Sequence, residues 1–101
     1  MGGSFFLRQA TETDLEEIWF YTLHNWGKEQ ADHYIAAIIS RFGWLADHPQ
    51  LGKHRAEVKP GYFCFPEGQH LIFYLRHDSA IEILAVVHQH MDYLNYLTNE
   101  S

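Results

Sequence analysis

The segment His88-Gln89-His90-Met91-Asp92 holds the side chains best suited to chemistry in this chain. On an extended segment, residues two apart point to the same side, so His88 and His90 could share a metal ion with Asp92 or exchange a proton with a substrate. No third ligand lies at a spacing typical of a metal site, and eight histidines in 101 residues make such a pair common by chance. The pattern therefore predicts no metal ion. It leaves His88 open as a general base or as a histidine bonded to the backbone.

A small basic cluster is the second candidate for function. Lys53, Arg55 and Lys59 lie close together in the chain, with Glu57 as their only acidic neighbour. Such side chains could contact an anionic group, and the alternative is a solvated loop that leads into a strand. We treat these three residues, together with the two histidines, as candidates for binding a target.

Other residues argue against covalent chemistry. Cys64 is the only cysteine, so no intramolecular disulfide can form, and its position between Phe63 and Phe65 predicts a buried, unreactive thiol. The chain contains no Gly-rich phosphate loop and no nucleophile elbow. No apolar run approaches the roughly 20 residues of a membrane span, and the start does not read as a signal peptide. We therefore predict no catalytic residue, no cofactor and a cytoplasmic protein.

The charge is acidic and unevenly spread. The formal net charge is −6, and residues 11–50 hold seven acidic but only two basic side chains. Coating a nucleic acid or docking on an anionic membrane needs a broad Lys/Arg surface, so we expect no direct nucleic-acid partner and no membrane. Trp19, Trp26 and Trp44 are accordingly interpreted as core or hairpin-packing residues rather than as platforms for stacked bases.

The sequence contains clear signals for two helices, which must help to position the candidate functional residues. Thr13 and Glu16 are spaced as a capping box, which predicts the start of a first helix, and Gly27 is expected to end it. From Lys28, apolar residues recur at steps of three and four until Pro49, which predicts a second helix. The tight turn between the two makes an antiparallel helical hairpin.

The remaining apolar runs are short or alternate, which is typical of strands. The expected strands are residues 5–9, an edge strand at 54–58, and residues 62–65, 71–75 and 81–87, with turns at 66–68 and 77–79 and a helical or irregular segment at 91–97. The order β-α-α-β-β-β predicts an α+β domain whose helical hairpin packs on a small antiparallel sheet. This single domain covers residues 5–98, and residues 1–4 are expected to be a flexible start or a cloning remnant.

An ordered set of short motifs covers nearly all of residues 5–97. They are Asp14-Leu15-Glu16-Glu17-Ile18-Trp19 with Tyr21, Trp26-Gly27-Lys28-Glu29-Gln30-Ala31 with Tyr34, Phe42, Leu45-Ala46-Asp47-His48-Pro49-Gln50-Leu51-Gly52 with Arg55, Phe65-Pro66-Glu67-Gly68-Gln69-His70-Leu71-Ile72-Phe73-Tyr74, Ile81-Glu82-Ile83-Leu84 and the segment 88–92. In this order and spacing the chain resembles the ParE toxins, a branch of the ParE/RelE superfamily found in type II toxin–antitoxin modules.

The resemblance implies a small toxin of the RelE/ParE-like fold. Its partner would be a ParD-like antitoxin whose C-terminal segment wraps around the toxin, and its target would be DNA gyrase. The implied action is inhibition by binding, so the protein would be a poison of a topoisomerase and not an enzyme. We expect the antitoxin to contact the outer face of the hairpin and the nearby strand edge, at Trp19, Tyr34, Ile38, Arg55, Met91 and Asp92.

The chain departs from the family at three positions. ParE-like sequences commonly place arginine where this chain has Phe63, Ala85 and His90, and the change removes guanidinium groups that would meet an acidic or phosphate-bearing target. Two alternatives therefore stay open. One is a ribosome-dependent mRNA endonuclease of the RelE type with His88 or His90 as the acid–base group, although such an enzyme needs cations for its transition state. The other is a ParE-fold binding protein that has lost its toxicity.

Overall fold

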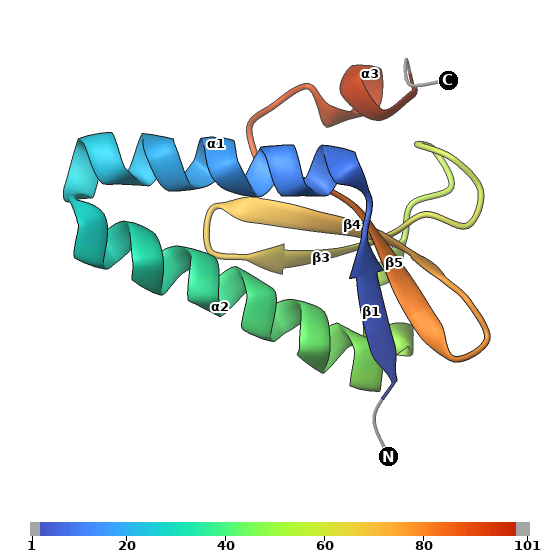
Figure 1. Ribbon diagram of the computed structural model, residues 1–101. Coiled ribbons are helices and arrows are strands. Elements are labelled where there is room, and N and C mark those ends of the chain that lie inside the picture. The colour runs from blue at the N-terminus through green and yellow to red at the C-terminus, as the bar shows by residue number, and fades with distance from the viewer. Residues whose placement is uncertain (1–2, 99–101) are drawn as a thin grey trace.

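The computed structural model describes residues 3–98 and places a helical hairpin across a five-stranded sheet (Figure 1). The elements in chain order are β1 (Ser4–Leu7), α1 (Gln9–Trp26), α2 (Lys28–Asp47), the 3-10 helix η1 (Pro49–Leu51), β2 (Lys53–His54), β3 (Phe63–Glu67), β4 (His70–Arg76), β5 (Ala80–His88) and α3 (Tyr93–Thr98). The sheet has the strand order β1-β5-β4-β3-β2. The predicted α+β class and its helical hairpin are confirmed.

The sheet is mixed rather than wholly antiparallel. The pairs β2–β3, β3–β4 and β4–β5 are antiparallel, whereas β1 lies parallel to β5. A parallel pair needs a long connection, and the chain from α1 to β4 supplies it. Strand β1 already begins at Ser4, which pairs with Ala80, so the first strand starts within the stretch expected to be a flexible start. Met1 and Gly2 lie outside the described residues.

Helix α1 begins earlier than the expected capping box. Its N-cap is Arg8, no side chain caps it, and Thr13 lies inside the helix with its hydroxyl donating to the Gln9 carbonyl at 3.4 Å. The capping box of Thr13 and Glu16 is therefore wrong. The cause is tertiary: the Arg8 N–H donates to the Ile83 carbonyl at 3.1 Å, so the chain passes from β1 into the helix without a loop.

The ends of the hairpin helices agree with the sequence. Gly27 has φ of 94° and lies between α1 and α2, in a left-handed conformation that a side chain disfavours. Helix α2 ends at Asp47, just before Pro49. A proline cannot continue a helix at its C-terminal end, so both predicted boundaries are confirmed.

The expected strand at residues 54–58 is wrong, because β2 covers only Lys53–His54. The carbonyl of Arg55 instead accepts the N–H groups of Val58 at 3.0 Å and Lys59 at 3.3 Å, which makes a turn. Val58 is 5% exposed, so burial of its side chain decides the local conformation.

The turn expected at residues 66–68 is displaced by the sheet. Pro66 pairs with Leu71 and Glu67 pairs with His70, so both belong to β3. The reversal therefore falls at residues 68–69, where Gly68 has φ of 58°. As a result, β4 begins at His70, one residue earlier than expected.

Two hydrophobic cores lie on opposite faces of the sheet, because alternate residues of a strand point to opposite sides. The core beneath the hairpin contains Ile18, Ile38, Phe42, Leu45, Ala46, Ile72, Tyr74, Ile81, Ile83 and Val86. The second core contains Val58, Tyr62, Cys64, Phe73, Leu84, Ala85, Val87 and Leu97. Cys64 is buried, as predicted, and burial raises the pKa of its thiol to about 11. Within residues 3–98, no helix has the length and apolar character needed to span a membrane.

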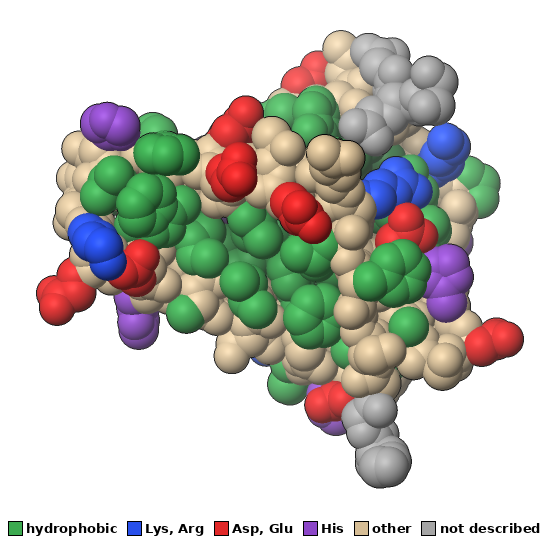
Figure 2. All heavy atoms as spheres, viewed as in Figure 1, with side chains coloured by type: hydrophobic (Ala, Val, Ile, Leu, Met, Phe, Trp, Pro, Cys, Tyr) green, Lys and Arg blue, Asp and Glu red, His purple; other side chains and the backbone are tan. Residues whose placement is uncertain are grey.

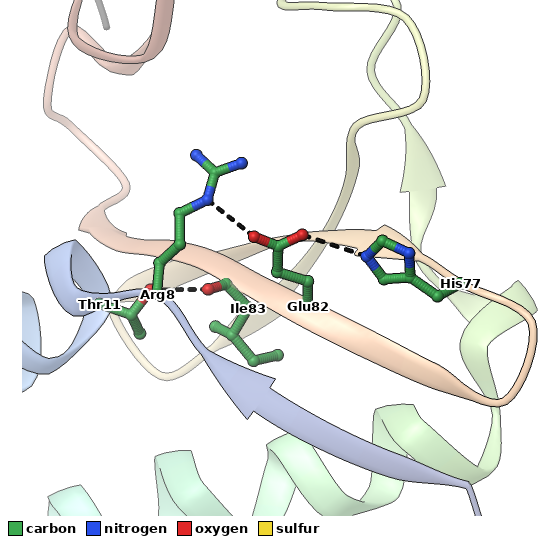
Figure 3. A network of polar contacts seen from close by, with 5 residues as sticks. All are labelled: Arg8, Thr11, His77, Glu82 and Ile83. Carbon is green, nitrogen blue, oxygen red and sulfur yellow. Dashed lines mark hydrogen bonds and ion pairs between the residues drawn. The ribbon is translucent and has the colours of Figure 1, made fainter. Parts of the chain in front are cut away.

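A polar network fastens the start of α1 to β5 (Figure 3). Glu82 on β5 accepts a hydrogen bond from Arg8 Nε at 2.9 Å and lies 3.1 Å from His77 Nε2. Thr11, which is wholly buried, donates its hydroxyl hydrogen to the Ile83 carbonyl at 2.8 Å. The carboxylate of Glu82 therefore links the β1–α1 junction to the turn between β4 and β5.

Replacing Glu82 by glutamine should lower the free energy of unfolding by about 1 kcal/mol at neutral pH, because the amide loses the charge-assisted bonds. Burial raises the pKa of Glu82, but hydrogen bonds from Arg8 and His77 outweigh it and hold the pKa below its usual value. A lowered folded-state pKa stabilises the protein above the unfolded value of about 4.3, and this stability is lost as the pH falls through the folded value. Urea denaturation should therefore show the difference at pH 7 and its disappearance in acid. An unchanged difference at pH 3 would contradict this account.

Candidate partner-binding groove

Two hollows of about 420 and 430 Å³ adjoin one another between the hairpin and one end of the sheet. They share three lining side chains, which are Tyr21 from α1, His70 from β4 and His88 from the end of β5. The first hollow continues along Asp14, Glu17, Ile18, Val86, Val87, Met91 and Tyr96, and the second along Thr22, Trp26, Gln30, Tyr34 and Gln69. We call the two together the histidine groove.

Strand pairing builds the centre of the groove. His70 and His88 are cross-strand partners, so their side chains share one face, with ring centroids 5.4 Å apart. The backbone N–H of His90 donates to His88 Nδ1 at 3.1 Å. A neutral ring that accepts at Nδ1 carries its proton on Nε2, so His88 presents an N–H donor rather than a lone pair for a metal. Within residues 3–98, no group of three His, Cys, Asp or Glu side chains is placed to hold a metal ion.

Tyr34 of α2 holds His70 in place. The phenol oxygen lies 2.6 Å from His70 Nδ1, accepts the Gln69 N–H at 3.0 Å and lies 3.3 Å from the Glu67 carbonyl. Burial and the neighbouring His88 lower the pKa of His70 to about 4. The His70 ring is therefore neutral at pH 7.

Acid should destabilise the protein through His70. In the unfolded chain His70 becomes protonated near the usual histidine pKa of about 6.5, whereas in the folded chain it becomes protonated only near pH 4. The contribution of His70 to stability is therefore fully present above the unfolded pKa and is lost as the pH falls toward the folded value. His70→Gln should flatten this part of the stability–pH curve, measured by urea denaturation. His33→Gln, an exposed change on α2, should leave the slope as it is, and equal slopes in wild type and His70→Gln would refute the assignment.

Asp14 is a groove residue that the sequence reasoning missed as such. It is 9% exposed, accepts the Val86 N–H at 3.0 Å and lies 3.4 Å from the Tyr96 hydroxyl. It thereby joins α1, β5 and α3. An acidic residue near a helix start looks like a favourable dipole partner, and only its position over β5 shows that it is buried.

The predicted target-binding residues fall in two separate places. His88 lines the histidine groove, with the ring of His90 5.4 Å away, whereas Lys53, Arg55 and Lys59 lie at β2 and the loop after it, at the far edge of the sheet. Arg55 is engaged in packing: its Nη2 donates to the Tyr93 hydroxyl at 2.6 Å and its Nε to Glu57 at 2.5 Å. These hydrogen bonds raise the pKa of Arg55. Arg55 therefore anchors α3 to the loop.

The predicted antitoxin-binding residues also divide. Tyr34 and Met91 line the histidine groove, and Asp92 is exposed beside it. Trp19 is half-buried, and its indole N–H donates to the carboxylate of Asp32 on α2 at 2.8 Å. Ile38 is wrong as a contact residue, because it is 0% exposed in the core beneath the hairpin. Helical spacing placed it on an apolar stripe, and that stripe faces the sheet at this position.

The three positions without the family's arginine differ in exposure. Phe63 is half-buried, with the guanidinium of Arg76 5.3 Å from its ring centroid. Ala85 is 2% exposed in the second core, and His90 is exposed. Of the three positions, therefore, only that of His90 is fully exposed, and it lies beside the histidine groove.

The tryptophans agree only partly with the packing interpretation. Trp44 is half-buried against Phe65, with ring centroids 5.1 Å apart, and Trp19 is half-buried between the hairpin helices. Trp26 is 65% exposed, so it is not a core residue. Figure 2 shows hydrophobic side chains gathered over the hairpin, with acidic side chains beside them along α1. Large apolar side chains left open on one face are typical of a binding surface.

Comparison with known proteins identifies the family to which the chain belongs and finds solved structures with the same fold. A family model described as "ParE toxin of type II toxin-antitoxin system, parDE" matches residues 5–93. A protein named Toxin ParE1 from Mycobacterium tuberculosis (strain CDC 1551 / Oshkosh) is 33% identical over 93 residues, which cover 91% of this chain and 95% of the relative. Toxin ParE1 from Caulobacter vibrioides is 34% identical over 86 residues, which cover 85% of this chain and 88% of the relative.

Two solved structures share the fold at lower identity. The chromosomal ParDE TA system from P. aeruginosa superimposes with a TM-score of 0.73 at 18% identity, over 85% of this chain and 95% of the other. The toxin–antitoxin complex RelBE2 from Mycobacterium tuberculosis gives 0.66 at 19% identity, over 88% and 100%. The fold is therefore RelE/ParE-like. With the family model matched over residues 5–93 and relatives one-third identical over nearly their whole length, the chain belongs to the ParE toxin family of type II toxin–antitoxin systems.

Proposed function

We propose that this protein is held inactive by a ParD-like antitoxin in the cytoplasm and, when released, inhibits DNA gyrase by binding it. The observation that carries the proposal is the ParE family match over residues 5–93. Relatives that this chain matches over most of their length are named toxins, and one structural neighbour is a ParDE system. The action is binding rather than turnover.

The chemistry of the histidine groove supports a protein partner over RNA cleavage. Among residues 3–98, none of the side chains that line the groove is Lys or Arg, while Asp14 and Glu17 do line it. A phosphate transition state gathers negative charge and needs cations to stabilise it. Tyr21 and Trp26 are instead 61% and 65% exposed, and such aromatic side chains favour contact with a polypeptide.

The test is induced expression of residues 1–101 in a bacterium. Growth should stop, co-expression of a neighbouring antitoxin gene should restore it, and the purified protein should block supercoiling of plasmid DNA by purified gyrase. Normal growth with a stable antitoxin complex would instead identify a binding protein that has lost toxicity. Normal growth with no complex would overturn the toxin–antitoxin proposal.

A second candidate is a ribosome-dependent mRNA endonuclease of the RelE type. The juxtaposition of His70, His88 and His90 favours it, since imidazoles can act as acid–base groups. Transcripts from expressing cells decide between the two. The gyrase proposal expects intact transcripts, whereas cleavage that is abolished by His88→Ala and retained in His33→Ala would establish the nuclease.

A further inference from the structure

The walls of the histidine groove have the composition of a site for an organic cation. Helix α1 contributes the carboxylates of Asp14 and Glu17, and the hairpin contributes the aromatic rings of Tyr21, Trp26 and Tyr34. Within residues 3–98, no lysine or arginine side chain lines either hollow to repel a cation. Carboxylates with electron-rich aromatic faces are the groups that attract guanidinium and ammonium ions.

Tyr21, which lines both hollows, connects Glu17 of the first hollow with Trp26 of the second. Glu17 and Tyr21 are four residues apart, so their side chains are neighbours on the helix surface. The Tyr21 ring makes an edge contact with Trp26, with centroids 6.2 Å apart and planes at 64°, and both side chains are more than half exposed. Asp14 is buried and already bonded to Val86, so Glu17 is the carboxylate open to a partner.

The remaining walls are compatible with a positive charge. Burial and the neighbouring His88 lower the pKa of His70, so its ring is neutral at pH 7. The aliphatic side chains that line the first hollow are Ile18, Val86, Val87 and Met91. A ligand for this groove therefore needs an apolar body as well as a cation.

We propose that the histidine groove binds an arginine side chain carried on an apolar segment of a partner polypeptide. The guanidinium lies against Tyr21 and Trp26 and pairs with Glu17, and the flanking apolar side chains of the partner contact Ile18, Val86, Val87 and Met91. Arginine is preferred to lysine because its planar, weakly hydrated group stacks on aromatic rings. The inference rests on the proposed function in one respect, which is that the partner carrying the arginine is then the antitoxin.

The binding test needs no antitoxin, so its failure is separate from failure of the proposed function. The probe is a short synthetic amphipathic peptide of leucine and alanine with one central arginine, made also with lysine, citrulline or glutamate at that place. We expect the arginine peptide to bind the full chain and to shift NMR signals of groove residues, including the indole N–H of Trp26. The lysine peptide should bind more weakly, and citrulline should cost roughly tenfold in affinity, because it keeps the shape without the charge.

Two matched pairs of variants locate the site. Glu17→Gln and Tyr21→Ala should each weaken binding of the arginine peptide severalfold. Glu29→Gln, on the first turn of α2, and Phe20→Ala, 54% exposed beside Tyr21, should not change it, because neither residue lines the groove. Equal binding of the arginine and citrulline peptides, shifts confined to the outer face of the hairpin, or equal effects of the two members of a pair would each overturn the proposal.

Discussion

Replacement of Asp14 by alanine should lower the free energy of unfolding by about 3 kcal/mol, measured by urea denaturation at pH 7. The carboxylate is 9% exposed and accepts the Val86 N–H at 3.0 Å. The substitution therefore leaves a buried backbone N–H on β5 without this acceptor. It also removes the oxygen that lies 3.4 Å from the Tyr96 hydroxyl. One change thus loosens α1, β5 and α3 together.

Two variants distinguish the loss of the buried hydrogen bond from the loss of a negative charge near the start of α1. Asp14→Asn keeps an oxygen for the Val86 N–H and should lose clearly less stability than Asp14→Ala. Glu16→Ala removes a carboxylate from the same part of α1, but the side chain is exposed and the change should stay within about 0.5 kcal/mol. If Asp14→Ala and Glu16→Ala cost the same, the buried hydrogen bond does not stabilise the fold as described.

Replacement of Phe42 by alanine should lower the free energy of unfolding by about 4 kcal/mol, because it leaves a cavity in the core beneath the hairpin. The ring is 0% exposed and contacts Phe5 of β1 with an edge-to-face geometry at 5.6 Å. The substitution would remove this contact between α2 and β1, which lies at an edge of the sheet. Chemical denaturation followed by far-UV circular dichroism measures the loss.

Trp26→Ala is the matched control for this prediction. It removes a larger aromatic group from the other end of the hairpin, but the side chain is 65% exposed and leaves no cavity. Stability should change by no more than about 0.5 kcal/mol, whereas peptide binding in the groove should fall. A large loss of stability in Trp26→Ala would show that the hairpin end is packed more tightly than its exposure indicates.

Local patterns in the sequence were enough for the helical hairpin and for the central strands. The apolar period of α2, Gly27 and Pro49 define helix boundaries through interactions between residues at most four apart. Strands β4 and β5 are apolar on both faces, which predicted their central place, and the sheet order places them there. The ordered motifs likewise led to the family that the comparisons establish.

The candidate site could be read from the sequence only in part. His88 and the nearby Met91 stood out by residue type and proved to line the groove, as did Tyr34. Ile38 did not, because an apolar stripe on a helix does not reveal which of its members meet the sheet. Arg55 was singled out for its charge, but its bond to Tyr93 joins residues 38 positions apart and has no local signal.

By itself, then, the sequence determined the helical hairpin, the central strands, the burial of the cysteine and the family. The tertiary structure alone decided that β1 lies parallel to β5, that α1 begins at Gln9 and that residues after His54 turn inward. It also decided the histidine groove, in which Tyr21, His70 and His88 meet from three separate elements. The physical reason is the same in each case: strand pairing and burial join groups far apart in the chain, and short-range periodicity carries no information about such partners.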